Sequence, residues 1–464
     1  MNSEKTFFGH PRGLATLFFT EFWERFSYYG MRALLVLFLV DSIETGGFGL
    51  DDKSANAIYG LYTMFVYLLA LPGGWLADRF FGLQKAVWYG GIIIACGHFS
   101  MAIPTEEFFF IGLILIVIGT GLLKPNISSI VGGLYKDDEP ARRDAGFSIF
   151  YMGINLGAVI APLITGYLGE SINWHLGFAA AGVGMLLGVI QYRVSSKSLG
   201  NIGAQPEGFD PANEKQIGFR KKVKLGLFGF LALLMILVLM TTFGFLNIDV
   251  VSVANVAFYV VAAVLVLFFV AIFLFGGLNK DEKKKIWAIA ILLIFSAIFW
   301  SGFEQAGSSL NLFAERYTDR FIGGWEMPAS FLQSINPTFI IILSPVFGWF
   351  WIQLAKRNLN PSIPLKFAFG LIFLGLGFAT MVIASYMLLS ADKVLPTWLL
   401  ITYFLHTTGE LFLSPVGLSA VTKLAPKRLV GQMMGAWFMS VAFGNLTQDN
   451  HGTEHTYPRA SDPK

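Results

Sequence analysis

Apolar runs long enough to cross a lipid bilayer recur along almost the whole chain of 464 residues. A helix needs about 20 apolar residues to span the hydrocarbon core. Hydrophobic residues make up 55% of the chain and charged residues 14%, with a mean hydropathy of +0.62. A single water-soluble core could not bury so much apolar surface. The sequence therefore predicts an all-α polytopic membrane protein. Its expected spans are 14–40, 55–76, 84–103, 108–134, 144–168, 174–194, 223–246, 254–276, 286–313, 328–354, 365–389, 397–421 and 429–446.

Polar segments group these spans into larger parts. We expect an N-terminal six-helix bundle at 14–194, a cytoplasmic linker at 195–222, an additional helix pair at 223–276, a C-terminal bundle at 277–446 and a polar tail at 447–464. Lys and Arg are concentrated in the connections on one side, among them 195–224 and 280–285. By the positive-inside rule this side is cytoplasmic, and the N-terminus lies there too.

The two bundles resemble one another in sequence. IGTGLLKPNISSI around Lys124 aligns with TTGELFLSPVGLSA around Ser414, and the interval from Gly119 to Pro125 equals that from Gly409 to Pro415. FYMGINLG at 150–157 likewise matches WFMSVAFG at 437–444, and WERFSYYG at 23–30 more weakly matches FEQAGSSL at 303–310. A duplicated bundle with a site between the copies is typical of transporters.

Ionisable side chains inside the expected spans are the candidate functional residues. An ionised group at mid-bilayer costs at least ~2.5–3.5 kcal/mol, so such groups need partners or a wet cavity. In the first span they fall on one helical stripe. A basic wall facing an acidic wall would suit a zwitterion, and a glutamate that becomes protonated would release a facing arginine. The residues are Glu21, Glu24, Arg25 and Arg32 in the first span, Lys124 in the fourth, and, when the extra pair 223–276 is left out of the count, Glu304 in the seventh (286–313) and Glu410 in the tenth (397–421).

Structural alternatives stand beside these functional interpretations. Glu21, Glu24 and Arg25 could form a purely structural cluster. His406, one turn before Glu410, is interpreted as a packing residue. The aspartate–arginine pair in GGWLADRFFGLQK at 73–85 is either a solvated turn or a conformational latch in the loop between the second and third spans.

Three motifs resemble a known family. GGWLADRFFG is similar to the loop motif of the major facilitator superfamily. EFWERFSYYG at 21–30 and FYMGINLGA at 150–158 together resemble the proton-dependent oligopeptide transporters, and the extra helix pair is similar to that of their bacterial members. The resemblance runs from about residue 14 to 446 and implies two six-helix bundles in the inner membrane. The family has a twelfth core helix, for which this sequence shows no apolar run.

The resemblance also implies roles for individual residues. Glu21, Glu24 and Arg25 match a motif implicated in proton coupling together with Lys124, and Arg32 matches an arginine that pairs with a proton-binding glutamate, here Glu304. Arg32 and Lys124 would face the carboxylate of a peptide and Glu410 its ammonium group. The other matching positions would contact peptide termini and backbone or line the pocket, although ordinary packing is an alternative for the aromatic ones. They are Asn155, Asn336, Tyr29, Tyr67, Tyr151, Trp300, Ser414 and Trp437.

The expected function is proton-coupled symport that imports di- and tripeptides by alternating access. The proton gradient would drive it, so no cofactor or metal is expected, and neither is nucleic acid as a partner. Hydrolase motifs such as G-x-S-x-G and H-E-x-x-H are missing from the sequence, which argues against an enzyme. The alternatives are a symporter for another small anionic or zwitterionic solute, such as nitrate or an amino-acid conjugate, and a peptide receptor that does not transport. Oligomeric state stays open.

Overall fold

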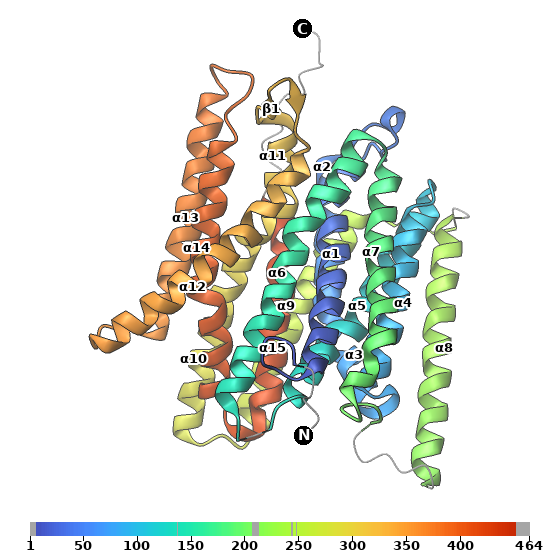
Figure 1. The fold of residues 1–464 in the computed structure, drawn as a ribbon, viewed down its shortest axis with the longest axis vertical. Coiled ribbons are helices and arrows are strands. Elements are labelled where there is room, and N and C mark those ends of the chain that lie inside the picture. The colour runs from blue at the N-terminus through green and yellow to red at the C-terminus, as the bar shows by residue number, and fades with distance from the viewer. Residues whose placement is uncertain (1–5, 137, 207–212, 243–244, 247, 452–464) are drawn as a thin grey trace. The chain divides into compact units, whose positions relative to one another are not determined.

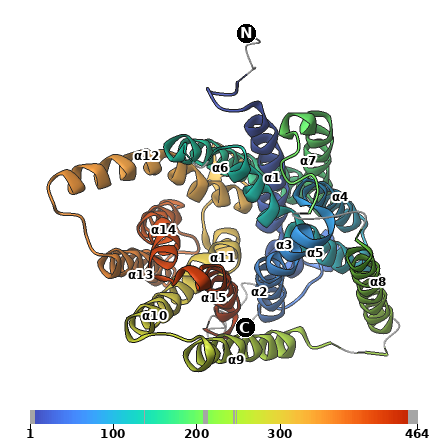
Figure 2. The ribbon, with the colours of Figure 1, turned by 90° about the horizontal axis from the view of Figure 1, so that it is seen from below.

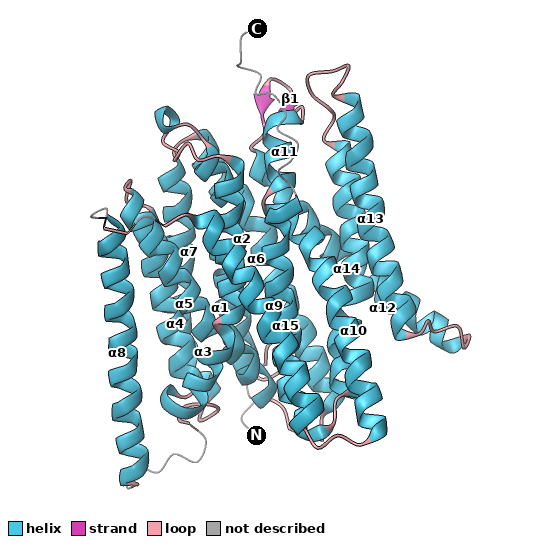
Figure 3. Ribbon diagram, turned by 180° about the vertical axis from the view of Figure 1, so that it is seen from behind, coloured by secondary structure: helices cyan, strands magenta, loops and turns pink. Residues whose placement is uncertain are grey.

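The computed structural model describes residues 6–136, 138–206, 213–242, 245–246 and 248–451. Its chain forms two compact units. Unit 1 comprises the chain up to Leu34, Phe65–Ile248 and Gln333–Ile341, and unit 2 comprises Leu35–Met64, Asp249–Leu332 and the chain from Ile342 onward. Almost all of the described chain is helical (Figure 3).

Within the described residues, each predicted span lies mostly in helix, which confirms the all-α fold (Figure 1). The segment expected to form the N-terminal bundle contains α1 (Arg12–Val40), α2 (Asp52–Leu68), α3 (Ala70–Leu76), α4 (Leu83–Met101), α5 (Glu106–Gly133), α6 (Pro140–Ser171) and α7 (Trp174–Ser195). The extra pair is α8 (Glu214–Thr242) and α9 (Val250–Phe275). The remaining helices are α10 (Lys280–Phe303), α11 (Ser309–Tyr317), α12 (Ile335–Lys356), α13 (Ile363–Met387), α14 (Thr397–Leu424) and α15 (Val430–His451).

Short helical turns connect several of these elements. They are the 3-10 turns η1 (Ile43–Thr45), η3 (Ser196–Leu199), η4 (Glu304–Gly307), η5 (Ala329–Ser334) and η6 (Lys427–Leu429), and the π-helical turn η2 (Ala77–Phe81). The expected linker 195–222 contains η3 and the first turns of α8, and its residues 207–212 lie outside the described chain. In the expected tail 447–464, α15 continues to His451, and the residues after it lie outside the described chain.

By length and composition, eight helical stretches of the described chain could cross a membrane. The most apolar is Val250–Phe275, with a mean hydropathy of 3.1. α1 is not among the eight, because its intramembrane charges exceed two in any window of sufficient length. The charged stripe that makes α1 a functional candidate is thus also what keeps α1 from meeting the composition of an ordinary membrane span.

Asp78 and Arg79 do not lie in a loop between the second and third spans, as the sequence suggested. α3 continues directly into the π-helical turn η2, which contains both Asp78 and Arg79. The helical path ends only at Gly82, whose φ of +81° is a conformation that glycine adopts without strain. The prediction of a loop was wrong because the wider π turn keeps the backbone hydrogen-bonded through Phe81.

The sequence repeat appears again in the way each unit packs. In unit 1, a Cβ added to Gly119 of α5 would lie 2.7 Å from the carbonyl oxygen of Gly90 in α4. In unit 2, a Cβ added to the matching Gly409 of α14 would lie 2.7 Å from the carbonyl oxygen of Gly370 in α13. Such close backbone contact between helices needs small residues. The aligned glycines Gly119 and Gly409 therefore have the same role, which is to let two neighbouring helices approach closely.

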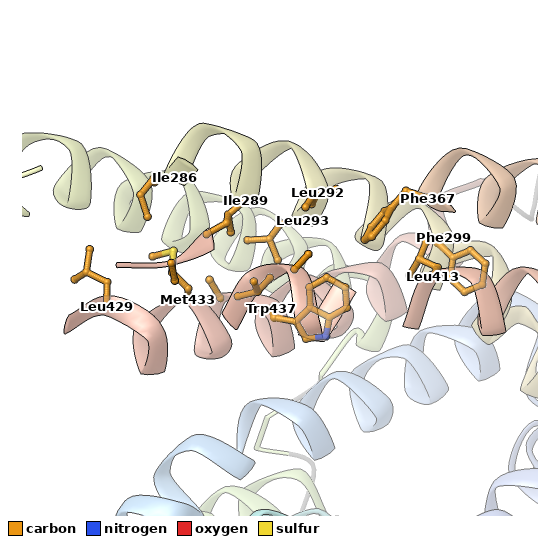
Figure 4. Packing of buried hydrophobic residues seen from close by; sticks show 14 of the residues in the cluster. Ile286, Ile289, Leu292, Leu293, Phe299, Phe367, Leu413, Leu429, Met433 and Trp437 are labelled. Carbon is orange, nitrogen blue, oxygen red and sulfur yellow. The ribbon is translucent and has the colours of Figure 1, made fainter. Parts of the chain in front are cut away.

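Unit 2 also has a continuous apolar core. Buried side chains from α10, α14 and α15 meet there, with Met433 and Trp437 of α15 facing Ile289 and Leu293 of α10 (Figure 4). α13 packs along α14, and α9 packs along α15 (Figure 2). This core positions α14, which carries Glu410, and α10, which ends directly before Glu304.

A small hairpin joins α11 to η5. Its strands β1 (Phe321–Ile322) and β2 (Trp325–Glu326) are antiparallel, with Ile322 opposite Trp325. Both turn residues, Gly323 and Gly324, have positive φ, as a tight two-residue hairpin turn requires. Arg320 next to the hairpin bonds to Glu326 at 2.9 Å, so this connection is held by its own ion pair.

Candidate functional site

Three charged side chains of the α1 stripe, Glu21, Glu24 and Arg25, form a buried network inside unit 1. The Arg25 guanidinium donates to both oxygens of the Glu24 carboxylate, with Nη2–Oε1 at 2.6 Å, and its Nε lies 3.3 Å from Oε1 of Glu21. The three side chains are at most 4% exposed. Two acids share one base, so the network has an excess negative charge when both carboxylates are ionised. Such an arrangement is suited to taking up a proton.

Lys124 of α5 belongs to the surroundings of this network. Its charge interacts with that of Glu21, and its Nζ lies 4.4 Å from the centre of the Tyr67 ring. The other oxygen of Glu21, Oε2, is buried and has no hydrogen-bond partner among the described residues. A cation and an incompletely bonded carboxylate in the same buried region are the ingredients of a proton-exchange site.

Two glycines of the FYMGINLG motif bring α6 against this stripe. A Cβ on Gly157 would overlap the carbonyl oxygen of Phe22 and lie 3.2 Å from Cβ of Arg25. A Cβ on Gly153 would lie 2.9 Å from the Phe18 ring. The motif therefore places Asn155, which lies between these glycines in sequence and is 4% exposed, on the helix that covers the network.

The other predicted site residues of unit 1 lie on α1, α6 and the start of α12. Asn155 donates to the Tyr151 carbonyl at 2.9 Å, within α6. Ser334 donates to the Val159 carbonyl at 2.7 Å, which fixes the start of α12 and hence Asn336 to the same helix. Tyr29 faces two cations, with Cζ of Arg32 5.8 Å and Cζ of Arg25 6.0 Å from its ring centre. Arg32 is 8% exposed, so it belongs to the protein interior.

In unit 2, Glu304 lies where the seventh predicted span breaks. α10 ends at Phe303, and the 3-10 turn η4 begins with Glu304, whose exposed fraction is 4%. α10 packs against α14, which carries the half-buried Glu410 and Ser414. His406 is 1% exposed and its ring lies 4.9 Å from that of Phe378, which fits the packing role expected for it.

The predicted pocket aromatics differ in their surroundings. Trp437 is 3% exposed, and a Cβ on Gly417 of α14 would overlap its ring, so it packs in the apolar core of unit 2. Trp300 packs edge-on against Phe303 with ring centres 5.3 Å apart. Tyr151 is 46% exposed. For Trp437 the packing alternative therefore fits the structure better than a role in the pocket.

Sequence reasoning missed an ion pair between Asp52, from the predicted N-terminal bundle, and Arg316, from the predicted C-terminal bundle. Both residues belong to unit 2 of the structure. Arg316 of α11 donates to both carboxylate oxygens of Asp52 at the start of α2, at 2.7 and 2.8 Å. Farther along α2, the hydroxyl of the fully buried Tyr59 occupies the space that a side chain on Gly307 would need. Two consecutive aspartates, Asp51 and Asp52, were visible in the sequence, but nothing in it pairs either with Arg316.

Some predicted relationships stay predictions. Arg32 belongs to unit 1 and Glu304 to unit 2, and the same holds for Lys124 and Glu410. The pairing of Arg32 with Glu304 and the opposed basic and acidic walls therefore rest on the sequence and on the resemblance. Among the described residues, no group of three or more His, Cys, Asp or Glu side chains could hold a metal ion.

Comparisons with known proteins agree on one family. The family model described as the POT family matches residues 84–458. The chain is similar to the peptide transporter YePEPT of Yersinia enterocolitica, with 44% identity over 95% of this chain and 87% of that protein. It is 39% identical to a di-/tripeptide transporter of Lactococcus lactis, over 94% of this chain and 88% of that one. The crystal structure of a mutant of the peptide transporter POT in complex with alafosfalin has a TM-score of 0.86 and 43% identity, over 96% of this chain and 89% of that chain.

Proposed function

The chain belongs to the POT family, and from this premise we propose that it imports di- and tripeptides in symport with protons, by alternating access. Peptide transport is the activity named for its relatives in Yersinia and Lactococcus. The observation in this structure that carries the proposal is the buried network of Glu21, Glu24 and Arg25, in which two carboxylates share one guanidinium.

Peptide recognition would use the fixed charges at the two ends of the substrate. Arg32 is buried and Lys124 half-buried, each cation lies against a tyrosine ring, and both would bind the carboxylate. Glu410, half-buried on α14, would bind the ammonium group. Asn155 and Asn336 would hydrogen-bond the peptide backbone. Because these groups contact only features common to all peptides, the transporter would tolerate many side chains.

Proton coupling would use two places. One is the Glu21–Glu24–Arg25 network together with Lys124, where a proton on a carboxylate changes what Arg25 can bind. The other is Glu304, a buried acid at a helix break. Protonation of Glu304 would end its attraction for Arg32 and leave Arg32 to the peptide carboxylate. Proton and peptide would thereby bind cooperatively.

The Asp52–Arg316 pair supports a mechanical part of this proposal. It joins α2 of the first predicted bundle to α11, which follows η4 directly. Tyr59 of α2 contacts η4 itself at Gly307. Glu304 is the first residue of η4. A change of its charge would therefore act on η4 and α11, the segment that Asp52 and Tyr59 of α2 contact. Alternating access needs such contacts to form in one state and break in another.

For its place in the cell we propose the inner membrane, with the N-terminus in the cytoplasm. The distribution of Lys and Arg between the connecting segments supports this orientation.

Substrate class can be tested by competition in proteoliposomes. Uptake of a labelled dipeptide should be inhibited by unlabelled di- and tripeptides and left unchanged by nitrate, single amino acids and tetrapeptides. Stronger inhibition by nitrate or by an amino-acid conjugate would transfer the proposal to that solute. Binding of the dipeptide without counterflow exchange would identify a receptor and reject transport.

A further inference from the structure

Unit 2 contains an apolar groove that the transport mechanism does not use. It has a volume of about 890 Å³ and lies between α9, α10 and α15, which pack side by side (Figure 2). On α9 its lining runs from Ala262 to Leu274, and on α10 from Trp287 to Ser301. Among the described residues that line it, only Ser301 and Ser440 carry an aliphatic hydroxyl, and the rest are apolar or aromatic.

The length of the groove matches one leaflet of a bilayer. Ala262 and Leu274 are separated along α9 by about 18 Å, at 1.5 Å per residue. One leaflet contributes about half of the ~30 Å hydrocarbon core, or roughly 15 Å. Because α9 and α10 are both candidate membrane spans, the groove lies at a depth where lipid tails surround the protein. A single acyl chain fits both its length and its apolar lining.

One end of the groove meets a cluster of positive charge. Leu274 is the penultimate residue of α9, and the turn that follows leads into the basic start of α10, NKDEKKK. Lys283 lies one helical turn before Trp287 and two turns before Ala290, so it shares the face of α10 that lines the groove. Lys285, only two residues farther on, projects from the opposite face.

The acidic residues of this turn are engaged elsewhere. Glu282 bonds to Arg428 at 2.7 Å and accepts from the backbone of Asn279 in a capping box. Asp281 lies 3.9 Å from Lys284. Within the described part of the chain, Lys283 forms no ion pair, and its side chain is exposed. An anion at this end of the groove would therefore meet uncompensated positive charge.

From the apolar groove and the lysine at its end, we propose that unit 2 binds an anionic phospholipid. One acyl chain occupies the groove, and the phosphate group contacts Lys283 at the start of α10. Trp287 lies between the two, at the level where amphipathic aromatic rings meet lipid headgroups. The charge at the groove end distinguishes this occupant from a neutral lipid and from a second protein chain, for which an apolar surface alone would suffice.

Native mass spectrometry of the full chain, delipidated and then titrated with phosphatidylglycerol or phosphatidylcholine, tests the proposal. Phosphatidylglycerol should bind more tightly. Lys283→Gln should weaken its binding about fivefold, the usual effect of one lysine near an anionic lipid surface. The matched control Lys285→Gln, with the same charge change on the opposite face, should change it less than about twofold. Ala290→Phe, which fills the groove, should reduce the binding of both lipids.

If Lys283→Gln and Lys285→Gln weakened phosphatidylglycerol binding equally, the lipid preference would come from diffuse surface charge, and the proposal would be overturned. Unchanged lipid binding by a folded Ala290→Phe variant would overturn it as well. If Ala290→Phe instead removed a dimer from the spectrum and left lipid adducts intact, the occupant would be a second copy of the chain. Should Ala290→Phe fail to fold, the comparison of the two lysine variants still decides.

Discussion

Asp52 and Arg316 are separated by 264 residues of sequence and meet in a two-pronged ion pair with N–O distances of 2.7 and 2.8 Å. Tyr59, two helical turns farther along α2, packs against Gly307. The start of α2 is thus attached at two points to the segment that begins with Glu304. The two side chains of the ion pair are 43% and 34% exposed, so solvent screens the pair and its contribution to the stability of the fold is small.

Breaking this pair should change transport more than stability. In Asp52→Asn, the loss of about 1 kcal/mol from one conformation would change the ratio of two states roughly fivefold. We expect dipeptide uptake to change by several-fold while the thermal midpoint in detergent stays nearly constant. The exchanged double variant Asp52→Arg with Arg316→Asp should recover uptake. Glu139→Gln, which breaks an exposed ion pair between the N-cap residue of α6 and Arg142 in its first turn, is the control, and an equal effect there would count against a gating role.

Glu304→Gln should separate exchange from concentration. The amide cannot release a proton, so peptide counterflow should continue while uptake driven by a pH gradient falls to the passive level. Both activities are measured in the same proteoliposomes. Full concentrative uptake by this variant would remove Glu304 from the coupling mechanism.

Arg25 should be important for stability because two buried acids depend on it. Arg25→Met leaves Glu24 without its main partner, which costs about 3–5 kcal/mol for a buried pair. Arg25→Lys keeps the charge but loses the two-pronged geometry, so its thermal midpoint should lie between those of Arg25→Met and the unchanged protein. Arg12→Met, at the exposed start of the same helix, is the control. Equal midpoints for Arg25→Met and Arg12→Met would show that the network contributes nothing to folding.

Gly157→Ala should lower stability by about 1–3 kcal/mol, since the added methyl group overlaps the Phe22 carbonyl. Gly431→Ala in α15 has no atom within 4 Å of the new methyl group and should stay within about 0.5 kcal/mol of the unchanged protein. Thermal unfolding in detergent compares them. A neutral Gly157→Ala would mean that α6 does not need its close approach to the stripe of α1.

The sequence predicted much of this fold, because an apolar run of membrane-spanning length has few alternatives to a helix. The repeat was also visible, and its glycines at 119 and 409 now have the same structural explanation. The breaks were not visible. The second predicted span, 55–76, is divided between α2 and α3, and the seventh, 286–313, is interrupted at Glu304, yet the sequence predicted a single span for each.

The reason is that hydropathy indicates whether a segment lies in the membrane and gives no information on which other segments it contacts. The break at η4 coincides with the contact between Gly307 and Tyr59, which belongs to a helix far away in sequence. The partner of Asp52 was hidden for the same reason. By contrast, Arg25 and its two acids are neighbours on one helix, so helical spacing alone predicted that they would meet. Their structural role and the proposed proton coupling are compatible, since the same network can stabilise α1 and exchange a proton.

The most direct test of the account is dipeptide uptake by proteoliposomes in which the pH gradient and the membrane voltage are set independently. We expect uptake to respond to each, and 100 mV acting on one net charge supplies ~2.3 kcal/mol, enough for accumulation on the order of tens of fold. Uptake that is equally fast and equally limited in the presence and absence of both gradients would contradict proton-coupled symport.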